Sequence, residues 1–261
     1  MNSKKVSICI PTFECAGEGE SYLATLLESI EKQSYKNIEV VISDHSLHNT
    51  LMKSSLEWMK RTEANLKYVM NKTHRGSSEA NLNNAIKLAT GDLIKPMYQD
   101  DFFYSDNAIE VMVNKLEEDN STWVAATTWH CQDQDSQSLF NNHPPTIPSN
   151  SESWLSGNNT LGSPSVIMYR VVEEYLDPFL VWFPDVEFYY RMWKMYGNPS
   201  LVTSPCIVTR LRKDGITNTE ITPTVVLEET QYNLKTHLSK EPVHLKDYPV
   251  IFSRAKRLNL L

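Results

Sequence analysis

Two adjacent carboxylates, Asp100 and Asp101, follow an apolar stretch at 93–97 that predicts a buried strand. Like charges placed side by side repel each other and are costly to remove from water, so a fold accommodates them most easily where a cation is bound. Mg²⁺ and Mn²⁺ take oxygen ligands, often one or two carboxylates together with substrate phosphates. The pair therefore indicates either a divalent-cation site or a solvated turn before the next helix.

The segments that lead up to this pair alternate between apolar strands and helices with one apolar face. Strands are predicted at 6–11, 38–42, 66–70 and 93–97. Apolar residues at helical spacing lie between them, and we expect the buried faces to carry Leu23, Leu26, Leu27 and Ile30, then Met52, Leu56 and Met59, then Leu82, Ala85, Ile86 and Ala89, with Gly91 ending the third helix. This alternation predicts an α/β fold with a Rossmann-like, mainly parallel sheet and helices on both faces.

The residues of chemical interest lie where these strands end. Thr12 ends the first strand, Asp44 the second, Arg75 lies in the loop after the third, and Asp100 and Asp101 follow the fourth. Ligands of such sheets bind in the crevice at the carboxyl ends of the strands. The four positions should therefore meet at one edge of the sheet, and this favours a binding site over a solvated turn.

The second half of the chain follows no regular alternation. Strands are predicted at 123–129, 165–169 and 206–211, and helices at 185–196 and 225–238. Residues 130–160 are polar and rich in Asn, Ser, Gln and Pro, which predicts a long loop. A loop of that length in a compact domain is usually a binding loop, a lid or a disordered segment.

Composition excludes several classes of protein. The net charge of −7 argues against a nucleic-acid binder. The four cysteines, at 9, 15, 131 and 206, form no C-x-x-C pair, so a zinc site or a disulfide framework is not expected. The start of the chain lacks the apolar run of a signal peptide, and no window approaches the about 18 apolar residues of a membrane span. We therefore expect a cytoplasmic protein.

The common nucleotide-binding motifs do not fit. Gly17 and Gly19 follow the first strand, but the third glycine of a dinucleotide fingerprint is missing, and Glu14, Glu18 and Glu20 would repel a pyrophosphate. There is no P-loop and no glycine-rich, arginine-containing loop of the kind that sugar-nucleotide pyrophosphorylases carry after the first strand.

Six stretches, taken in order, resemble the family 2 glycosyltransferases, which have the GT-A fold. They are VSICIPTF at 6–13, the pattern LxxxLxSIxxQSY at 23–35, IEVVISD at 38–44, SEANLNNAIKLATGD at 78–92 followed by QDD at 99–101, NNTLGSPSVIMYR at 158–170, and DVEFYYR at 185–191. The resemblance covers roughly residues 5–215 and makes the functional interpretation of the Asp pair the favoured one.

This resemblance implies an enzyme that transfers a sugar from a nucleoside diphosphate donor, expected to be UDP-linked, to an acceptor hydroxyl with inversion at the anomeric carbon. It also implies one GT-A domain over 1–261. Within it we expect a nucleotide-sugar-binding half at 1–103, an acceptor-binding half of mixed structure at 104–215, and a helical C-terminal extension at 216–261.

The family pattern assigns roles to the residues at the strand ends. Asp101 is the expected ligand of Mn²⁺ or Mg²⁺, and Asp100 lies nearer the ribose or the waters of the metal. Pro11, Thr12 and Glu14 lie under the nucleotide, as the family's first strand end does.

Two further nucleotide contacts are implied by the same pattern. Asp44 accepts a hydrogen bond from the uracil ring or the ribose, and Arg75 pairs with the diphosphate or contacts the base. Without the resemblance, Asp44 would be interpreted as a turn residue and Arg75 as a solvated cation.

The resemblance also implies a general base. Asp185 stands six residues before Arg191, the spacing expected in the family, although Pro184 precedes it where the family often has Glu. Glu187 is the alternative, because residues two apart on a helix face different ways and only one should reach the acceptor. Arg212 stands where the family frequently has histidine, and it either contacts the diphosphate or is exposed.

The expected acceptor is a glycan or a lipid-linked glycan in surface polysaccharide biosynthesis, used in the cytoplasm or at the inner face of the membrane. Contact with a membrane would be peripheral at most. The candidate for such contact is the basic and apolar stretch 252–261, and the alternative is that this stretch is an ordinary packed terminus.

Two other functions stay open at this point: a non-catalytic GT-A module that binds nucleotide sugars, and a nucleotidyltransferase, which the missing glycine-rich loop disfavours.

Overall fold

The structure of the protein is a computed structural model that describes residues 3–132 and 135–261. Met1 and Asn2 of the sequence start, and residues 133 and 134 of the predicted long loop, lie outside the described residues. The strands are β1 (Val6–Thr12), β2 (Ile38–Asp44), β3 (Leu66–Met70), β4 (Leu93–Pro96), β5 (Phe102–Phe103), β6 (Trp123–Gln132), β7 (Asp135–His143), β8 (Ile167–Arg170) and β9 (Ser200–Leu211). The α-helices are α1 (Gly19–Glu31), α2 (Thr50–Thr62), α3 (Ser78–Leu88), α4 (Ala108–Glu118), α5 (Pro184–Tyr196), α6 (Ile216–Thr219), α7 (Pro223–Leu238) and α8 (Pro249–Arg257).

Within the described residues the nine strands form one sheet in the order β3-β2-β1-β4-β8-β6-β9-β5, with β7 paired to β6. The first four strands in this order are parallel. Strand β8 then joins antiparallel to both β4 and β6, while β9 runs parallel to β6. The predicted α/β fold, with a parallel half followed by a mixed half, is confirmed.

Helices cover both faces of the sheet, because side chains alternate along a strand and buried strands need cover on each side. Ile8 and Ile10 of β1 belong to one apolar cluster with α1, α2 and α4, and Cys9 between them belongs to a second cluster with α3 and α5. Each fully buried Ile or Leu in these clusters contributes about 1.5–3 kcal/mol. All four cysteines lie among the described residues, where they are buried and form no disulfide.

Two details of the first half differ from the prediction. Helix α2 buries Leu51, Ser55 and Trp58, one residue away from the predicted face, and Leu56 is 36% exposed. Helix α3 ends with Ala89 as its C-cap, so Gly91 does not end it. Gly91 lies instead against β1, where a Cβ would be only 2.5 Å from the hydroxyl oxygen of Ser7. Its role is to allow close approach of the backbone.

The prediction of a long loop at 130–160 is wrong for most of its length. Strand β6 continues to Gln132, β7 pairs antiparallel with it from Asp135 to His143, and the 3-10 helix η2 spans Ser151–Ser156. Among the described residues, β7 pairs with β6 outside the main order of the sheet, and its sequence lacks the apolar pattern of a strand buried on both faces.

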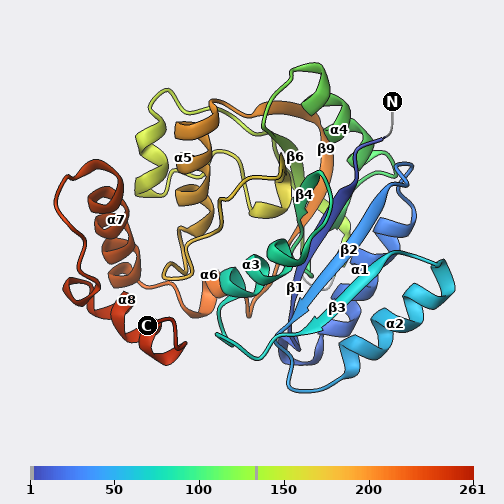
Figure 1. Cartoon of the computed structure of the whole chain (residues 1–261), viewed down its shortest axis with the longest axis horizontal. Coiled ribbons are helices and arrows are strands. Elements are labelled where there is room, and N and C mark those ends of the chain that lie inside the picture. The colour runs from blue at the N-terminus through green and yellow to red at the C-terminus, as the bar shows by residue number, and fades with distance from the viewer. Residues whose placement is uncertain (1–2, 133–134) are drawn as a thin grey trace.

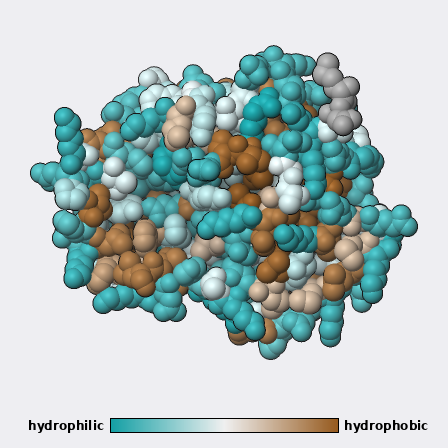
Figure 2. All heavy atoms as spheres, viewed as in Figure 1, coloured by the Kyte–Doolittle hydropathy of each residue, from teal (hydrophilic) through white to brown (hydrophobic). Residues whose placement is uncertain are grey.

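The C-terminal helices pack against the second half of the chain, before residue 216. Figure 1 shows α7 and α8 beside α5 and the start of α3, on the opposite side of the molecule from α2. Leu180 forms a small apolar cluster with Tyr232, Tyr248 and Ile251. Figure 2 shows apolar side chains gathered over these helices, and others over the middle of the same face. Among the described residues, none of the helices has the length and apolar character needed to cross a membrane.

Candidate active site

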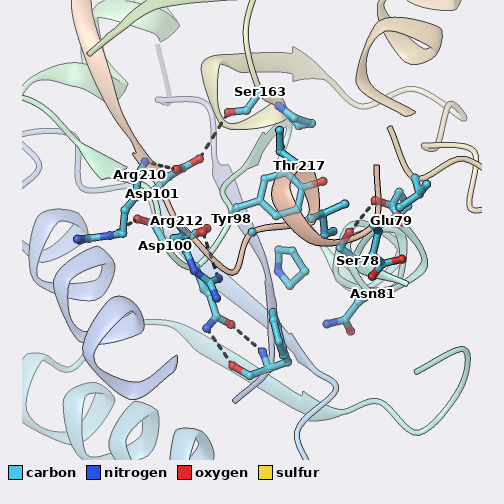
Figure 3. Close-up of a pocket in the computed structure, with 18 of the residues that line it drawn as sticks. Ser78, Glu79, Asn81, Tyr98, Asp100, Asp101, Ser163, Arg210, Arg212 and Thr217 are labelled. Atoms are coloured by element: carbon cyan, nitrogen blue, oxygen red, sulfur yellow. Dashed lines mark hydrogen bonds and ion pairs between the residues drawn. The ribbon is translucent and has the colours of Figure 1, made fainter. Parts of the chain in front are cut away.

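A cleft of about 650 Å³ opens at the carboxyl ends of β1 and β4 and continues to the start of α5. Its lining includes six residues predicted from the sequence, namely Pro11, Thr12, Glu14, Asp100, Asp101 and Asp185. Figure 3 shows the Asp pair on one side, Glu79 and Asn81 of α3 on the other, and Tyr98 between them. Residues from both halves of the chain therefore share one cavity, as the rule for the carboxyl edge of parallel sheets predicts.

Asp44 is fully buried and supports the floor of the cleft without lining it. The register of β1 and β2 places it beside Thr12. One carboxylate oxygen accepts a hydrogen bond from the Thr12 hydroxyl at 3.0 Å and from the Ser46 backbone N–H at 2.9 Å, and the other accepts from the Tyr68 hydroxyl at 2.5 Å. In this conformation its hydrogen bonds fix the end of β1.

Arg75 also lies outside the lining of the cleft, next to Gly76, which lines it. Its guanidinium donates to the backbone carbonyl of Ser46 at 3.0 Å, and this ties the loop after β3 to the loop after β2. The Arg75 Nε is buried and has no hydrogen-bond partner among the described residues. Part of this guanidinium therefore retains an unused donor close to the cleft.

The Asp pair has an uneven environment. Asp100 lies 3.4 Å from the Arg212 guanidinium. Asp101 is 3% exposed and accepts hydrogen bonds from neutral groups, the Arg210 backbone N–H at 3.1 Å and the Ser163 hydroxyl at 3.5 Å. Burial and the neighbouring Asp100 charge raise the pKa of Asp101. The pair thus concentrates negative charge that a bound cation would relieve.

The donor atoms at this position fit a hard divalent cation. Mg²⁺ and Mn²⁺ are commonly held by one or two carboxylates, with substrate phosphates and water completing the shell. Among the described residues there is no cluster of three or more His, Cys, Asp or Glu side chains that would make a closed metal site. Asp100 and Asp101 match an open metal site, in which the phosphates of a bound substrate and water would supply the remaining ligands of the ion.

Arg212 is buried beside the Asp pair, so it is not an exposed cation. Its guanidinium forms a bidentate ion pair with Asp214, at 3.0 and 2.7 Å, and lies 5.0 Å from the centre of the Tyr22 ring. It also donates to the Cys15 sulfur at 3.2 Å. Arg212 thus brings a fixed positive charge into the cleft next to Asp100.

Asp185 and Glu187 have separate environments on the first turn of α5. Asp185 lines the cleft, and its carboxylate accepts from the Asn159 side chain at 2.7 Å and from the Val186 N–H at 2.8 Å. Glu187 is 3% exposed and is held by Arg191 at 2.7 Å and His237 at 2.8 Å. Only Asp185 of these two is placed to meet a ligand in the cleft, and burial raises its pKa to about 7.

Several residues at the site were not singled out from the sequence. Three of them are Tyr98, Glu79 and Asn159, which lie inside or next to the stretches that resemble the family. Their position in those stretches was the only sequence feature that could have indicated a role at the site. Gln99 has a structural role: its amide bonds both the N–H and the C=O of Phe13, at 2.7 and 2.9 Å, and so joins the end of β1 to the loop that carries the Asp pair.

Comparisons with known proteins agree on family and fold. Residues 7–174 match the family model described as glycosyl transferase family 2. A putative glycosyltransferase EpsE of Bacillus subtilis is 31% identical over 128 residues, which is 49% of this chain and 44% of EpsE. The GalNAc(5)-diNAcBac-PP-undecaprenol beta-1,3-glucosyltransferase of Campylobacter jejuni is 25% identical over 114 residues, 44% of this chain and 35% of that protein. The chain thus spans less than half the length of the curated relatives it matches.

Two solved structures share the fold over nearly the whole chain. S. aureus TarS 1–349 in complex with UDP-GlcNAc aligns with a TM-score of 0.66 and 18% identity, covering 97% of this chain and 73% of TarS. Mannosyltransferase PcManGT from Pyrobaculum calidifontis, in complex with GDP-Man and Mn²⁺, aligns with a TM-score of 0.61 and 14% identity, covering 100% of this chain and 71% of PcManGT. At this identity the likeness establishes the GT-A fold alone.

Proposed function

Because the chain belongs to glycosyl transferase family 2, we propose that it transfers a sugar from a nucleoside diphosphate-sugar to an acceptor hydroxyl, with inversion at the anomeric carbon. One observation carries this proposal: the Asp100–Asp101 pair and Asp185 come from different halves of the chain and line the same cleft. Inverting transfer needs charge stabilisation on one side of the anomeric carbon and a base on the other.

Asp185 is the proposed general base. In the reaction the acceptor oxygen bonds to the anomeric carbon, the bond from that carbon to the diphosphate oxygen breaks, and the proton of the acceptor hydroxyl passes to Asp185. The hydrogen bond from Asn159 fixes the carboxylate in the cleft. A pKa of about 7, raised by burial, suits a base that works near neutral pH.

The opposite side of the cleft is suited to the leaving diphosphate. Asp101 and Asp100 are the proposed ligands of a divalent cation, Mn²⁺ or Mg²⁺, which when bound would neutralise the negative charge that gathers on the diphosphate. Arg212 offers a permanent positive charge beside Asp100. The complex of the structurally similar PcManGT with GDP-Man and Mn²⁺ supports the use of a divalent cation.

The nucleotide is proposed to lie over the end of β1, against Pro11, Thr12, Glu14 and Asp100. Asp44 fixes Thr12 from below, in the part of the site where the uracil ring or ribose would bind, and Arg75 fixes the adjoining loops and has an unused donor for the base or the diphosphate. The TarS complex with UDP-GlcNAc supports a uridine donor as the first to test.

The proposed acceptor is a glycan or a lipid-linked glycan, used in the cytoplasm or at the inner face of the membrane for surface polysaccharide synthesis. The support is the relative from Campylobacter jejuni, a glucosyltransferase named for an undecaprenol-linked glycan.

A panel of nucleoside diphosphates and nucleotide sugars, each with and without Mn²⁺, tests the donor half of this proposal by thermal shift. One nucleotide at about 100 times its Kd should raise the unfolding free energy by about 2.7 kcal/mol, and this gain should depend on Mn²⁺. Asp101→Asn should remove the metal dependence. Asp106→Asn, the same change at an exposed position nearby, should leave it intact.

Turnover is measured as release of the nucleoside diphosphate in the presence of candidate glycans. Release that requires both Mn²⁺ and an acceptor would support the transferase. Tight, metal-dependent binding without turnover on any acceptor would contradict catalysis and indicate a binding module instead.

A further inference from the structure

The segment 177–184 forms the wall of the cleft that leads into the proposed base. Val181, Trp182 and Pro184 of this segment line the cleft, and Asp185 follows directly. The segment is neither helix nor strand until α5 begins at Pro184, so its backbone groups need hydrogen-bond partners from elsewhere. The C-terminal helices supply partners for five of these groups.

Glu229 on α7 holds three consecutive backbone groups of this segment. Its carboxylate is 1% exposed and accepts the N–H groups of Val181, Trp182 and Phe183 at 2.7, 2.9 and 3.0 Å. One side chain therefore fixes the backbone immediately before Asp185.

Arg254 on α8 holds the carbonyl groups of the same segment. It is 8% exposed, and one guanidinium nitrogen donates to the carbonyls of Pro178 and Leu180, each at 2.8 Å. The other terminal nitrogen pairs at 3.3 Å with Glu79, which lines the cleft at the start of α3. Arg254 therefore joins the 177–184 segment to the α3 side of the same cavity.

A third contact completes the attachment. The hydroxyl of Tyr232, on α7 one turn after Glu229, donates to the Asp177 carboxylate at 3.0 Å. Hydrogen bonds from α7 and α8 thus engage the segment from its first residue to the one before α5. Both helices lie beyond residues 7–174, where the chain matches the family model.

We propose that α7 and α8 form part of the active site by holding the 177–184 segment, with Glu229 and Arg254 as positioning residues for Asp185. This inference rests on the proposed function for the role of Asp185. It assigns to the C-terminal extension the task of keeping the base in reach of the acceptor, because a displacement of about 1 Å at a reacting group can cost 100-fold in rate.

The test compares Glu229→Gln and Glu229→Leu with Glu228→Gln in the full chain. Glu228 is the neighbour on α7, and its carboxylate accepts the N–H groups of Val250 and Ile251 at 2.8 and 3.3 Å, at the start of α8. It is a matched control, because its loss disturbs the same pair of helices without touching the 177–184 segment.

The first readout is hydrogen exchange of the amides at 181–183, which needs no activity. Exchange there should rise in both Glu229 variants, more for Leu than for Gln, which keeps one oxygen acceptor. The Glu228 variant should resemble the wild type at these amides. Unchanged exchange in the Glu229 variants would overturn the inference.

The second readout separates positioning from loss of folded protein. The kcat of transfer should fall by roughly 10–100-fold in Glu229→Leu and less in Glu229→Gln, while donor KM and the stoichiometry of nucleotide binding stay unchanged. Raised exchange together with a wild-type kcat would overturn the inference, as would an equal loss of kcat in the Glu228 variant. If Glu229→Leu does not fold, Glu229→Gln carries both readouts.

Failure of the proposed function would look different. A wild-type chain that binds no nucleotide and transfers no sugar would defeat that proposal, whereas the exchange measurement would still decide whether α7 holds the segment.

Discussion

The two sides of the cleft are positioned in different ways. On the proposed donor side, Thr12 ends a strand and the Asp pair follows one, so the parallel pairing of β1, β2 and β4 helps to place them. On the proposed acceptor side, Asp185 lies in the first turn of a helix that follows an irregular segment, and side chains such as Asn159 and Glu229 place it. The proposed donor side takes its geometry mainly from the sheet, with side-chain hydrogen bonds from Asp44 and Gln99 added. The proposed acceptor side has no such pairing of strands behind Asp185 and depends on a few long-range hydrogen bonds.

This difference predicts which property, donor binding, catalysis or stability, is lost when each side of the cleft is altered. A change that spares the sheet should leave donor binding intact even when it removes catalysis. A change that disturbs the sheet should lower stability first, because many backbone hydrogen bonds between the strands are weakened together.

Replacement of Asp185 by Asn should have the largest effect. Removal of the base should lower transfer by about 10²–10⁴-fold, while the thermal shift with donor and Mn²⁺ stays as in the wild type. Steady-state transfer assays together with thermal-shift titration measure both quantities.

Glu187→Gln is the matched control for that variant. Glu187 is held by Arg191 and His237 away from the cleft, so its loss should lower the melting temperature while transfer continues at lower temperature. Full activity of Asp185→Asn, or loss of chemistry only in Glu187→Gln, would contradict the assignment of the base.

The pH dependence of transfer should show an intermediate effect. Burial raises the pKa of Asp185 to about 7, so the base is protonated below neutral pH and ionised above it. Transfer should therefore rise with pH through about 7, at roughly tenfold per unit on the acid limb.

Asn159→Ala should move the acid limb of the pH–activity profile to higher pH. The Asn159 amide donates to the Asp185 carboxylate at 2.7 Å and so favours its charged form. Its removal raises the pKa further, by about one unit or more if the lost hydrogen bond to the charged group contributes about 1.5 kcal/mol or more. Transfer at pH 7 should therefore fall by about fivefold or more. Asn158→Ala is the control, because that side chain bonds Ser153; a limb that moves equally in both variants would argue against the pair of Asn159 and Asp185.

Gly91→Ala should have the smallest effect on catalysis and acts on the donor side. The new Cβ would lie 2.5 Å from the Ser7 hydroxyl oxygen and 2.7 Å from the Lys5 carbonyl oxygen, so β1 must shift. We expect a loss of about 1–3 kcal/mol in the free energy of unfolding, with kcat preserved where the protein stays folded. Denaturant unfolding measures the loss, and a large fall in kcat without destabilisation would contradict a donor side built by the sheet.

The first half of the fold was predictable because its signals are local. Buried parallel strands are continuous apolar runs, and the helices between them show one apolar face. Helix α2 shows the limit: residues 51, 55 and 58 and residues 52, 56 and 59 have the same spacing. The spacing alone therefore does not show which of these two faces of the helix is buried. In the structure it is the face with Leu51 and Trp58, which pack in the apolar cluster with α1.

By itself, the sequence determined the α/β class, the strand ends that carry Thr12 and Asp44, and the Asp pair at the carboxyl edge. Only the tertiary structure decided that Asp185 enters the cleft while Glu187 is held in an ion pair, and that Glu229 and Arg254 hold the wall beside the base. The physical reason is that the periodicity of a strand or a helix depends on residues close together in the sequence. A hydrogen bond between a side chain and a distant backbone group depends instead on how separate elements pack.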